Sequence, residues 1–217
     1  MDFEQARFNM VEQQIRPWEV LNQEVLDLLF ELKREEFVPE AYRGLAFADV
    51  EIPLGYGEVM LAPKLEARIL QEVTLESTDR VLEVGTGSGY MAALFSHQAA
   101  HVDSVEIVPE FKIRAAAKLA QHGIHNVALY EGDAAQGWSG EQPYDVIVLS
   151  GSVPILPERF RDMLAAQGRL FAVIGEALPM KAIRLIRVGK DDYRSEILFE
   201  TAIPPLRNAV QPQRFVF

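Results

Sequence analysis

Three glycines on alternate positions form the stretch of this sequence that best fits ligand chemistry. Gly85, Gly87 and Gly89 directly follow the apolar run 81–84 and precede residues with helical spacing. Glycine accepts positive φ and lets the backbone approach a ligand closely. A turn of this kind before a helix presents free backbone N–H groups, which suit a nucleotide-like ligand. The stretch therefore predicts a strand, a tight turn and a helix start at a ligand site.

Glu83, two residues before the first glycine, indicates which ligand fits. A carboxylate here repels a pyrophosphate and attracts the ammonium and sulfonium groups of S-adenosylmethionine, by on the order of a few kcal/mol. The dinucleotide pattern G-x-G-x-x-G fits poorly, because its third glycine position is Tyr90. We therefore expect S-adenosylmethionine as the cofactor. The alternatives are a NAD-type dinucleotide and a glycine-rich turn that binds nothing.

Two further acidic residues follow the next two apolar runs. Glu106 lies in the predicted strand 101–107, and Asp133 comes shortly after the predicted strand 126–130. In an open parallel sheet, ligands bind outside the carboxyl ends of the strands. Glu106 lies about 20 residues after the glycine turn, a spacing typical of an acid that binds ribose hydroxyls. Asp133 is placed to accept from an adenine amino group. Each acid alone could be a solvated strand end, but together with Glu83 they indicate one site.

The composition fits a single domain without thiol chemistry. The chain has 217 residues, a formal net charge of −11 and no cysteine. The charge disfavours nonspecific nucleic-acid binding, and the missing cysteines exclude disulfides and thiolate nucleophiles. We expect no metal site, no membrane segment and a cytoplasmic location. Ser88 lacks the G-x-S-x-G pattern of a serine nucleophile.

The elements that must position these residues read as an N-terminal helical part followed by an α/β part. Phe8, Val11 and Ile15 recur at helical spacing, and Asn22 is a plausible N-cap for the next helix. The range 52–63 is rich in glycine and proline, which predicts a loop or a short extended segment. We expect one domain over 1–217. Residues 1–75 would form a helical cap and substrate loop, and residues 76–217 the cofactor-binding sheet with C-terminal strands.

Alternating strands and helices after residue 76 predict an α/β fold with a doubly wound, mostly parallel sheet. The tail 204–217 contains three prolines and is expected to lie extended over the surface. The expected strands are 80–84, 101–107, 126–130, 144–149, 168–174, 182–188 and 193–201, and the expected helices in and before this part include 64–73, 109–121 and 157–165.

Several blocks of the sequence occur in the order seen in protein-L-isoaspartate O-methyltransferases, a family that this chain resembles from about Met10 to Gly175. VLEVGTGSGY is specific to methyltransferases of this fold, and the N-terminal blocks select the family. The closing residues 214–217 resemble the family's last strand. The blocks are MVEQQI, FVPE, FAD, PLGYG, VLEVGTGSGY, SVE, GD and QGRL.

This resemblance implies a Rossmann-like methyltransferase fold with extra N-terminal helices over the site. It also implies transfer of the methyl group of S-adenosylmethionine to the α-carboxylate of isoaspartyl residues in damaged proteins. The implied cofactor-binding residues are Glu83, Gly85, Thr86, Gly87, Ser88, Gly89, Glu106, Ile107, Gly132, Asp133 and Ala134. The implied substrate loop is Gly57, Glu58, Val59, Met60, Leu61 and Ala62.

The substrate loop departs from the family pattern Gln-Thr-Ile-Ser-x-Pro. The family's serine, which hydrogen-bonds near the substrate carboxylate, falls on Leu61, and its threonine falls on Val59. Glu58 also puts a negative charge where an anionic substrate should dock. No catalytic residue is therefore assigned; Ser150 and Ser152 are the candidates to replace the serine.

Three functions remain open at this point. The first is repair methylation of isoaspartyl proteins, and the second is methylation of a different, more apolar substrate in a diverged pocket. The third is a noncatalytic protein that binds S-adenosylmethionine. The expected partners are a protein or peptide substrate or an unknown small molecule, with no nucleic acid and no membrane. We expect a monomer rather than an oligomer.

Overall fold

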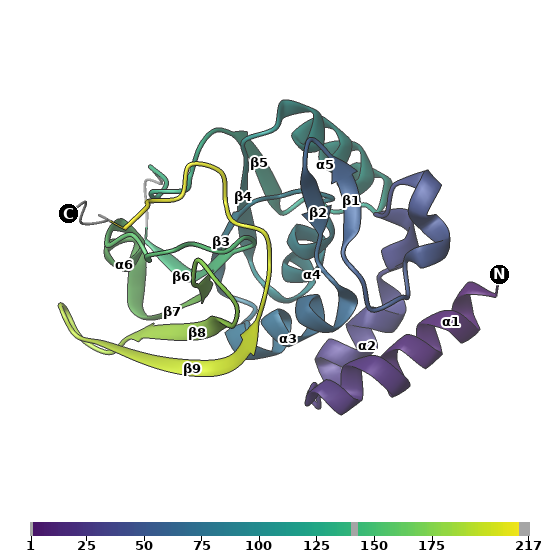
Figure 1. Ribbon diagram of the computed structural model, residues 1–217, viewed down its shortest axis with the longest axis horizontal. Coiled ribbons are helices and arrows are strands. Elements are labelled where there is room, and N and C mark those ends of the chain that lie inside the picture. Colours follow the sequence, from purple (N-terminus) through teal and green to yellow (C-terminus); the bar gives the residue numbers. More distant parts are fainter. Residues whose placement is uncertain (1, 140–142, 213–217) are drawn as a thin grey trace.

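The computed structural model describes residues 2–139 and 143–212, and Figure 1 shows their arrangement. The N-terminal part is helical as predicted. It contains α1 (Phe3–Met10), a π-helical turn (Val11–Ile15) and α2 (Gln23–Glu31), followed by short helical turns at Arg34–Glu36 and Glu40–Leu45.

The start of α2 confirms the predicted N-cap. The Asn22 side chain accepts from the backbone N–H groups of Glu24 and Val25 at 2.9 and 3.3 Å. Phe8, Val11 and Ile15 lie in the predicted helical segment; Phe8 is 51% exposed, whereas Val11 and Ile15 are fully buried. The chain winds as a π-helix from Val11 to Ile15, which changes the helical spacing along this stretch.

A seven-stranded sheet forms the centre of the molecule and confirms the predicted mostly parallel α/β fold. The strand order is β5-β4-β3-β6-β7-β8-β9; the first five are parallel, and β8 is antiparallel to both its neighbours. The bounds are β3 (Arg80–Val84), β4 (His101–Glu106), β5 (Val127–Glu131), β6 (Tyr144–Leu149), β7 (Leu164–Ile174), β8 (Met180–Arg187) and β9 (Tyr193–Thr201).

The predicted helix 157–165 is shorter than expected. The helix α6 covers only Arg159–Asp162, and β7 already begins at Leu164, which pairs with Tyr144 of β6. The pairing shifts in register before Arg169, and a Cβ on Gly168 would lie 3.1 Å from the carbonyl oxygen of Tyr144. Because Leu164 pairs with β6, the end of the predicted helix forms a strand instead.

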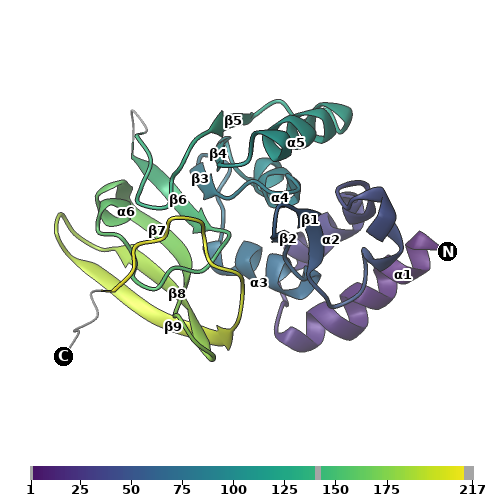
Figure 2. The ribbon, with the colours of Figure 1, turned by 45° about the horizontal axis from the view of Figure 1, so that its top comes forward.

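Helices cover both faces of the sheet, as Figure 2 shows. On one face lie α3 (Pro63–Val73), α4 (Tyr90–Gln98) and α5 (Pro109–Gln121), and on the other lie α6 and the C-terminal segment. The buried apolar side chains form two hydrophobic cores. Because side chains alternate along a strand, neighbouring residues enter different cores, Val81 one and Leu82 the other. The connections from β3 and β6 leave in opposite directions, and this divergence places a crevice beside the end of β3.

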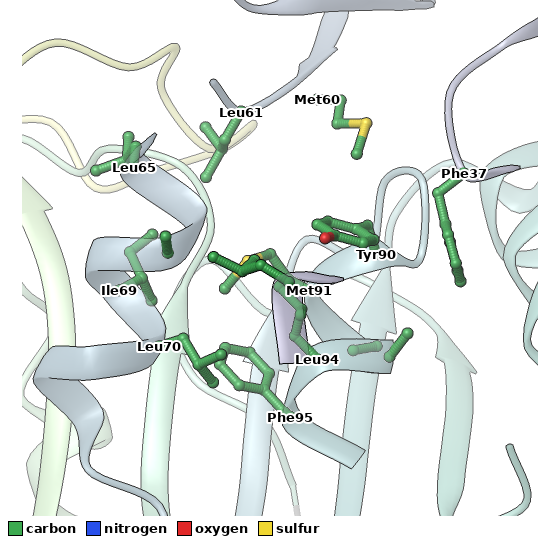
Figure 3. Packing of buried hydrophobic residues seen from close by; sticks show 14 of the residues in the cluster. Phe37, Met60, Leu61, Leu65, Ile69, Leu70, Tyr90, Met91, Leu94 and Phe95 are labelled. Carbon is green, nitrogen blue, oxygen red and sulfur yellow. The ribbon is translucent and has the colours of Figure 1, made fainter. Parts of the chain in front are cut away.

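The range 52–63 forms a two-stranded hairpin of β1 (Ile52–Gly55) and β2 (Glu58–Met60), in agreement with the expected short extended segment. Figure 3 shows Met60 and Leu61, at the end of the hairpin, above Tyr90 and Met91 of α4. The side chains of Met60 and Leu61 are buried. Packing on α3 and α4 therefore fixes the end of the substrate loop.

The tail is not simply laid over the surface as predicted. Ile203 and Ala209 are buried, and Ser152 exchanges two backbone hydrogen bonds of 2.9 Å with Pro204 and Leu206. The described part of the tail is therefore part of the fold, because its apolar residues complete the core. The predicted last strand at 214–217 lies outside the described residues.

Neither a membrane-spanning helix nor a metal cluster is found within the described ranges. In 2–139 and 143–212, no helix has the length and apolar character needed to cross a membrane. In the same ranges, no three histidine, aspartate or glutamate side chains gather where a metal ion would be held.

Candidate functional site

The glycine turn joins the end of β3 to the start of α4. Gly85, Gly87 and Gly89 have φ values of +98°, +51° and +84°, which other residues rarely adopt. A Cβ on Gly89 would also lie 2.9 Å from the Cβ of Ala115 on α5. Glycine is therefore needed both for the turn and for the close approach of α5.

Glu106, at the end of β4, holds this turn in place. Its Oε2 accepts from the backbone N–H of Gly87, and its Oε1 accepts from that of Val108, both at 2.8 Å. Burial raises the pKa of Glu106, although these backbone hydrogen bonds lower it. Each carboxylate oxygen can accept more than one hydrogen bond, so both retain capacity for ligand hydroxyls.

Glu83 is completely buried beneath the turn. Its Oε2 accepts from the Ser104 hydroxyl at 2.5 Å, whereas its Oε1 has no hydrogen-bond partner in the described part of the chain. Burial, and to a smaller extent the nearby Glu106 carboxylate, raise the pKa of Glu83 to about 8, although the Ser104 and Ser150 hydroxyls lower it. A buried carboxyl with an unpartnered oxygen is an arrangement that a cationic ligand would complete.

Asp133 follows β5 at another end of the crevice. Its Oδ1 accepts from the backbone N–H of Ala135 at 3.0 Å, and its Oδ2 accepts from the side-chain amide of Asn208 at 2.7 Å. Ala134 is buried beside it, and Gly132 leaves room for the Trp138 ring, which would lie 2.8 Å from an added Cβ. The carboxylate is thus fixed from both sides.

Three adjoining hollows meet at Gly85 and bring the predicted acids together. The central hollow has an empty volume of about 540 Å³, part of it open to solvent. Glu106 lines the central hollow and the one that contains Asp133, and Glu83 lines the third. Of the predicted cofactor residues, the hollows are lined by Glu83, Gly85, Thr86, Gly87, Ser88, Glu106, Ile107, Gly132, Asp133 and Ala134.

The predicted substrate loop forms a wall of the same hollows. Glu58, Val59 and Leu61 line the central one, and Met60 lines the one that contains Glu83. Gly57 and Ala62 flank these residues without lining the hollows found in the described structure. The wall is therefore mostly apolar, with a single carboxylate near the hairpin tip.

A buried arginine anchors the end of the loop. Arg34 donates to the carbonyl oxygens of Leu61 at 2.6 Å and Ala46 at 2.5 Å, and it forms an ion pair of 2.7 Å with Glu66. Arg34 and Glu66 are each 1% exposed. Burial raises the pKa of Glu66, whereas its contact with Arg34 lowers it. The loop conformation thus depends on a cation from the N-terminal helical part.

Comparison with known proteins gives the family. The family model described as protein-L-isoaspartate(D-aspartate) O-methyltransferase (PCMT) matches residues 5–203. The chain belongs to this family. Members of the PCMT family are O-methyltransferases that use S-adenosylmethionine. The family resemblance and the cofactor predicted from the sequence are therefore confirmed at this level.

Individual relatives agree with the family model over most of the chain. A protein-L-isoaspartate O-methyltransferase 1 of Rhodopseudomonas palustris (strain HaA2) is 37% identical over 205 residues, which are 94% of this chain and 84% of the relative. A protein-L-isoaspartate O-methyltransferase of Methanoculleus marisnigri is 37% identical over 192 residues, 88% of this chain and 86% of the relative.

Solved structures of PCMT proteins have the same fold. One protein-L-isoaspartate O-methyltransferase matches with a TM-score of 0.77 at 25% identity over 93% of this chain, which spans 65% of that longer chain. A structure from Plasmodium falciparum, described as a candidate protein-L-isoaspartate O-methyltransferase in complex with S-adenosyl-L-homocysteine, matches with a TM-score of 0.76 at 19% identity. The match covers 95% of this chain and 99% of the Plasmodium falciparum chain.

The two candidates to replace the family's serine, Ser150 and Ser152, lie in different surroundings. Ser150 lines two of the hollows, and its buried hydroxyl lies near the Glu83 carboxyl, whose pKa it lowers, but it makes no hydrogen bond of normal geometry within the described residues. Ser152 is fully buried, and its hydroxyl donates to the carbonyl oxygen of Ile203 at 3.1 Å. Ser152 thus attaches the tail, whereas Ser150 faces the crevice.

The contribution of the tail to the site was not predicted from the sequence. Pro204, Pro205, Leu206 and Arg207 line the central hollow opposite the substrate loop. Leu206 comes within 3.7 Å of the position of an added Cβ on Gly85. The available signal was the recurrence of apolar residues at 203, 206 and 209, which indicates a packed segment rather than a surface tail.

Proposed function

We propose that this protein transfers the methyl group of S-adenosylmethionine to the α-carboxylate of isoaspartyl residues in proteins or peptides. Family membership and the names of the relatives support this proposal. The observation that carries it is the crevice itself. A buried carboxyl with an unpartnered oxygen, Glu83, lies in hollows continuous with the family's substrate loop.

The residues of the crevice fit the cofactor. Glu83, whose Oε1 has no hydrogen-bond partner among the described residues, lines the hollow suited to the positive end of S-adenosylmethionine, and Glu106 and Asp133 line the parts suited to ribose and adenine. A pyrophosphate would place a further negative charge near these carboxyls and is disfavoured. In this assignment Glu83 attracts the cation, Glu106 binds the ribose, and Asp133 selects the base.

When bound, S-adenosylmethionine supplies a methyl group on a cationic sulfur; an acceptor carboxylate oxygen bonds to the methyl carbon as the carbon–sulfur bond breaks, leaving a neutral thioether. A carboxylate is already an anion near neutral pH, so the protein needs no general base. Alignment by the loop wall supplies the catalysis, and the buried Leu61 keeps water from the acceptor. The Ser150 hydroxyl would donate a hydrogen bond to the acceptor carboxylate.

Methyl transfer to matched peptides tests this function. The protein is incubated with radiolabelled S-adenosylmethionine and two peptides that differ only in carrying isoaspartate or aspartate at one position. We expect transfer that depends on isoaspartate. Ser150→Ala should lower kcat by about 10- to 100-fold, because it removes a hydrogen bond to a charged group. Ser195→Ala, an exposed serine on β9, is the matched control and should leave kcat unchanged.

A second acceptor class is favoured by one observation, the apolar surface of Val59 and Leu61 in the loop wall. An enzyme with a diverged pocket would methylate a more apolar substrate and ignore the isoaspartyl peptide. If Leu61→Ser then creates isoaspartyl activity in an inactive wild type, the diverged pocket is the better account. Cofactor binding without transfer to any acceptor would instead indicate a noncatalytic binding protein.

The proposal includes a protein or peptide acceptor and a monomeric enzyme, with no nucleic-acid or membrane partner. The formal net charge of −11 opposes binding to a phosphate backbone.

A further inference from the structure

An ion pair joins the substrate loop to the tail across the central hollow. Arg207 Nε lies 2.5 Å from Glu58 Oε1, and Arg207 Nη2 donates to the carbonyl oxygen of Tyr56 at 2.5 Å. The side chains of Arg207 and Glu58 are 39% and 29% exposed. Figure 1 shows the tail passing beside the hairpin that carries Tyr56 and Glu58. The pair therefore lies at the solvent side of the crevice, not in the core.

Arg207 stands out by its charge. Among the lining residues of the three hollows, in the described parts of the chain, it is the only cation. Acidic residues line the same hollows: Glu58, Glu66, Glu83, Glu106 and Asp133. These carboxyls suit a cationic cofactor, but an anionic acceptor needs a positive group.

The guanidinium group retains a donor for such an acceptor. Arg207 uses Nε for Glu58 and Nη2 for Tyr56, and no described residue accepts from Nη1. A guanidinium can bind a carboxylate through two parallel hydrogen bonds. Glu58, a carboxylate on a partly exposed loop, holds the group in the way that a substrate carboxylate would.

We propose that Arg207 is the docking residue for the carboxylate of the methyl acceptor. In the free enzyme Glu58 pairs with Arg207, and the acceptor carboxylate displaces Glu58 when it binds. This inference rests on the proposed function and names the group that recognises the substrate. It also resolves the negative charge that the sequence places in the substrate loop, because Arg207 compensates Glu58 in the free enzyme. The acceptor then displaces one carboxylate by another.

A docking role and a purely structural role for this ion pair predict different directions for the effects of two substitutions on activity. If the ion pair only held the crevice closed, Arg207→Ala and Glu58→Gln would break the same contact and change activity in the same direction. If Arg207 docks the acceptor, Arg207→Ala removes the group that binds the acceptor carboxylate. Glu58→Gln instead removes the carboxylate that competes with the acceptor for Arg207. The two substitutions should then act in opposite directions on the KM for the acceptor.

The experiment measures steady-state kinetics with an isoaspartyl peptide at saturating S-adenosylmethionine. Arg207→Ala should raise KM by about 10- to 100-fold with a smaller change in kcat, the range expected for a hydrogen bond to a charged group. Glu58→Gln should lower KM several-fold. Arg207→Lys, which keeps the charge without the fork, should lie between wild type and Arg207→Ala. A KM raised in both Arg207→Ala and Glu58→Gln would overturn the assignment.

Two further measurements separate this inference from the proposed function. Calorimetry with S-adenosylhomocysteine should give similar cofactor affinity in wild type and Arg207→Ala; a parallel loss of cofactor affinity would overturn the assignment. Calorimetry with the peptide, on protein saturated with S-adenosylhomocysteine, reports docking without turnover. Wild type that binds the peptide but transfers no methyl group would contradict the proposed function, while opposite Kd shifts in the two variants would still support Arg207. Absence of peptide binding would overturn the Arg207 assignment.

Discussion

The substrate loop is held by two arginines in contrasting surroundings. Arg34 lies in the core with Glu66, each 1% exposed, and fixes the carbonyl oxygen of Leu61. Arg207 lies near the solvent with Glu58, at 39% and 29% exposure, beside the hairpin tip. The same residue type thus anchors one end of the loop permanently and leaves the other end able to exchange partners.

The difference shows how burial decides what an ion pair does. Removing one partner of a buried pair leaves an uncompensated buried charge and costs about 3–5 kcal/mol. An exposed pair contributes about 0–1 kcal/mol, because water and salt screen it. We therefore assign the Arg34 pair to stability and the Arg207 pair to recognition.

The largest effect is expected from Arg34→Met. It leaves Glu66 buried without its cation and frees the Leu61 carbonyl oxygen, so unfolding should become easier by about 3–5 kcal/mol. For a chain of this size, the melting temperature should fall by roughly 6–20 °C, measured by thermal denaturation.

Two controls accompany Arg34→Met. Arg16→Met breaks the half-exposed pair with Glu12 and should lower the melting temperature by only about 0–4 °C. Arg34→Met combined with Glu66→Gln should recover part of the loss, because no unpaired charge remains buried. Equal effects of Arg34→Met and Arg16→Met would break the comparison between the two regions.

An intermediate effect on stability is expected from Glu83→Gln. This substitution tests a buried acid that is proposed to bind a cationic ligand, in contrast to Glu66, which is already paired with Arg34. The pKa of Glu83 is raised from 4.5 to about 8, so its favourable contribution to stability is complete below pH 4.5 and is lost as pH rises through about 8. The neutral glutamine should therefore raise the melting temperature more at pH 8 than at pH 5. Thermal denaturation without cofactor at both pH values measures this, and an unchanged difference between them would contradict it.

The smallest effect on stability is expected from Arg207→Ala. The pair with Glu58 is partly exposed, so the free energy of unfolding should change by about 0–1 kcal/mol even though KM for the acceptor rises. Urea denaturation measures the change. A loss as large as that in Arg34→Met would make Arg207 a structural residue and would remove the contrast.

The sequence was sufficient where the signals are local. The glycine turn and the acids Glu83, Glu106 and Asp133 could be placed because each follows or ends a strand, and parallel strands end at the same edge of a sheet. Neighbouring residues and strand order supply this information without knowledge of side-chain packing.

The rest of the site depends on contacts between distant residues. Arg34 contacts the loop 27 residues away, and Arg207 contacts Glu58 149 residues away. The predicted helix 157–165 was also too long, because Leu164 pairs with Tyr144 of β6 instead. No pattern along the chain specifies such partners.

The most direct test of the central claim is calorimetric titration of S-adenosylmethionine at pH 6, 7 and 8 into wild type and Glu83→Gln. A cationic ligand favours the ionised form of a carboxyl whose pKa is about 8. Wild-type affinity should therefore rise by up to about tenfold per pH unit, with release of a proton on binding. Glu83→Gln should bind at least about tenfold more weakly at pH 8 and show little of this pH dependence. Equal affinities in both proteins at every pH, or binding of NAD in place of S-adenosylmethionine, would contradict a crevice built for a cationic methyl donor.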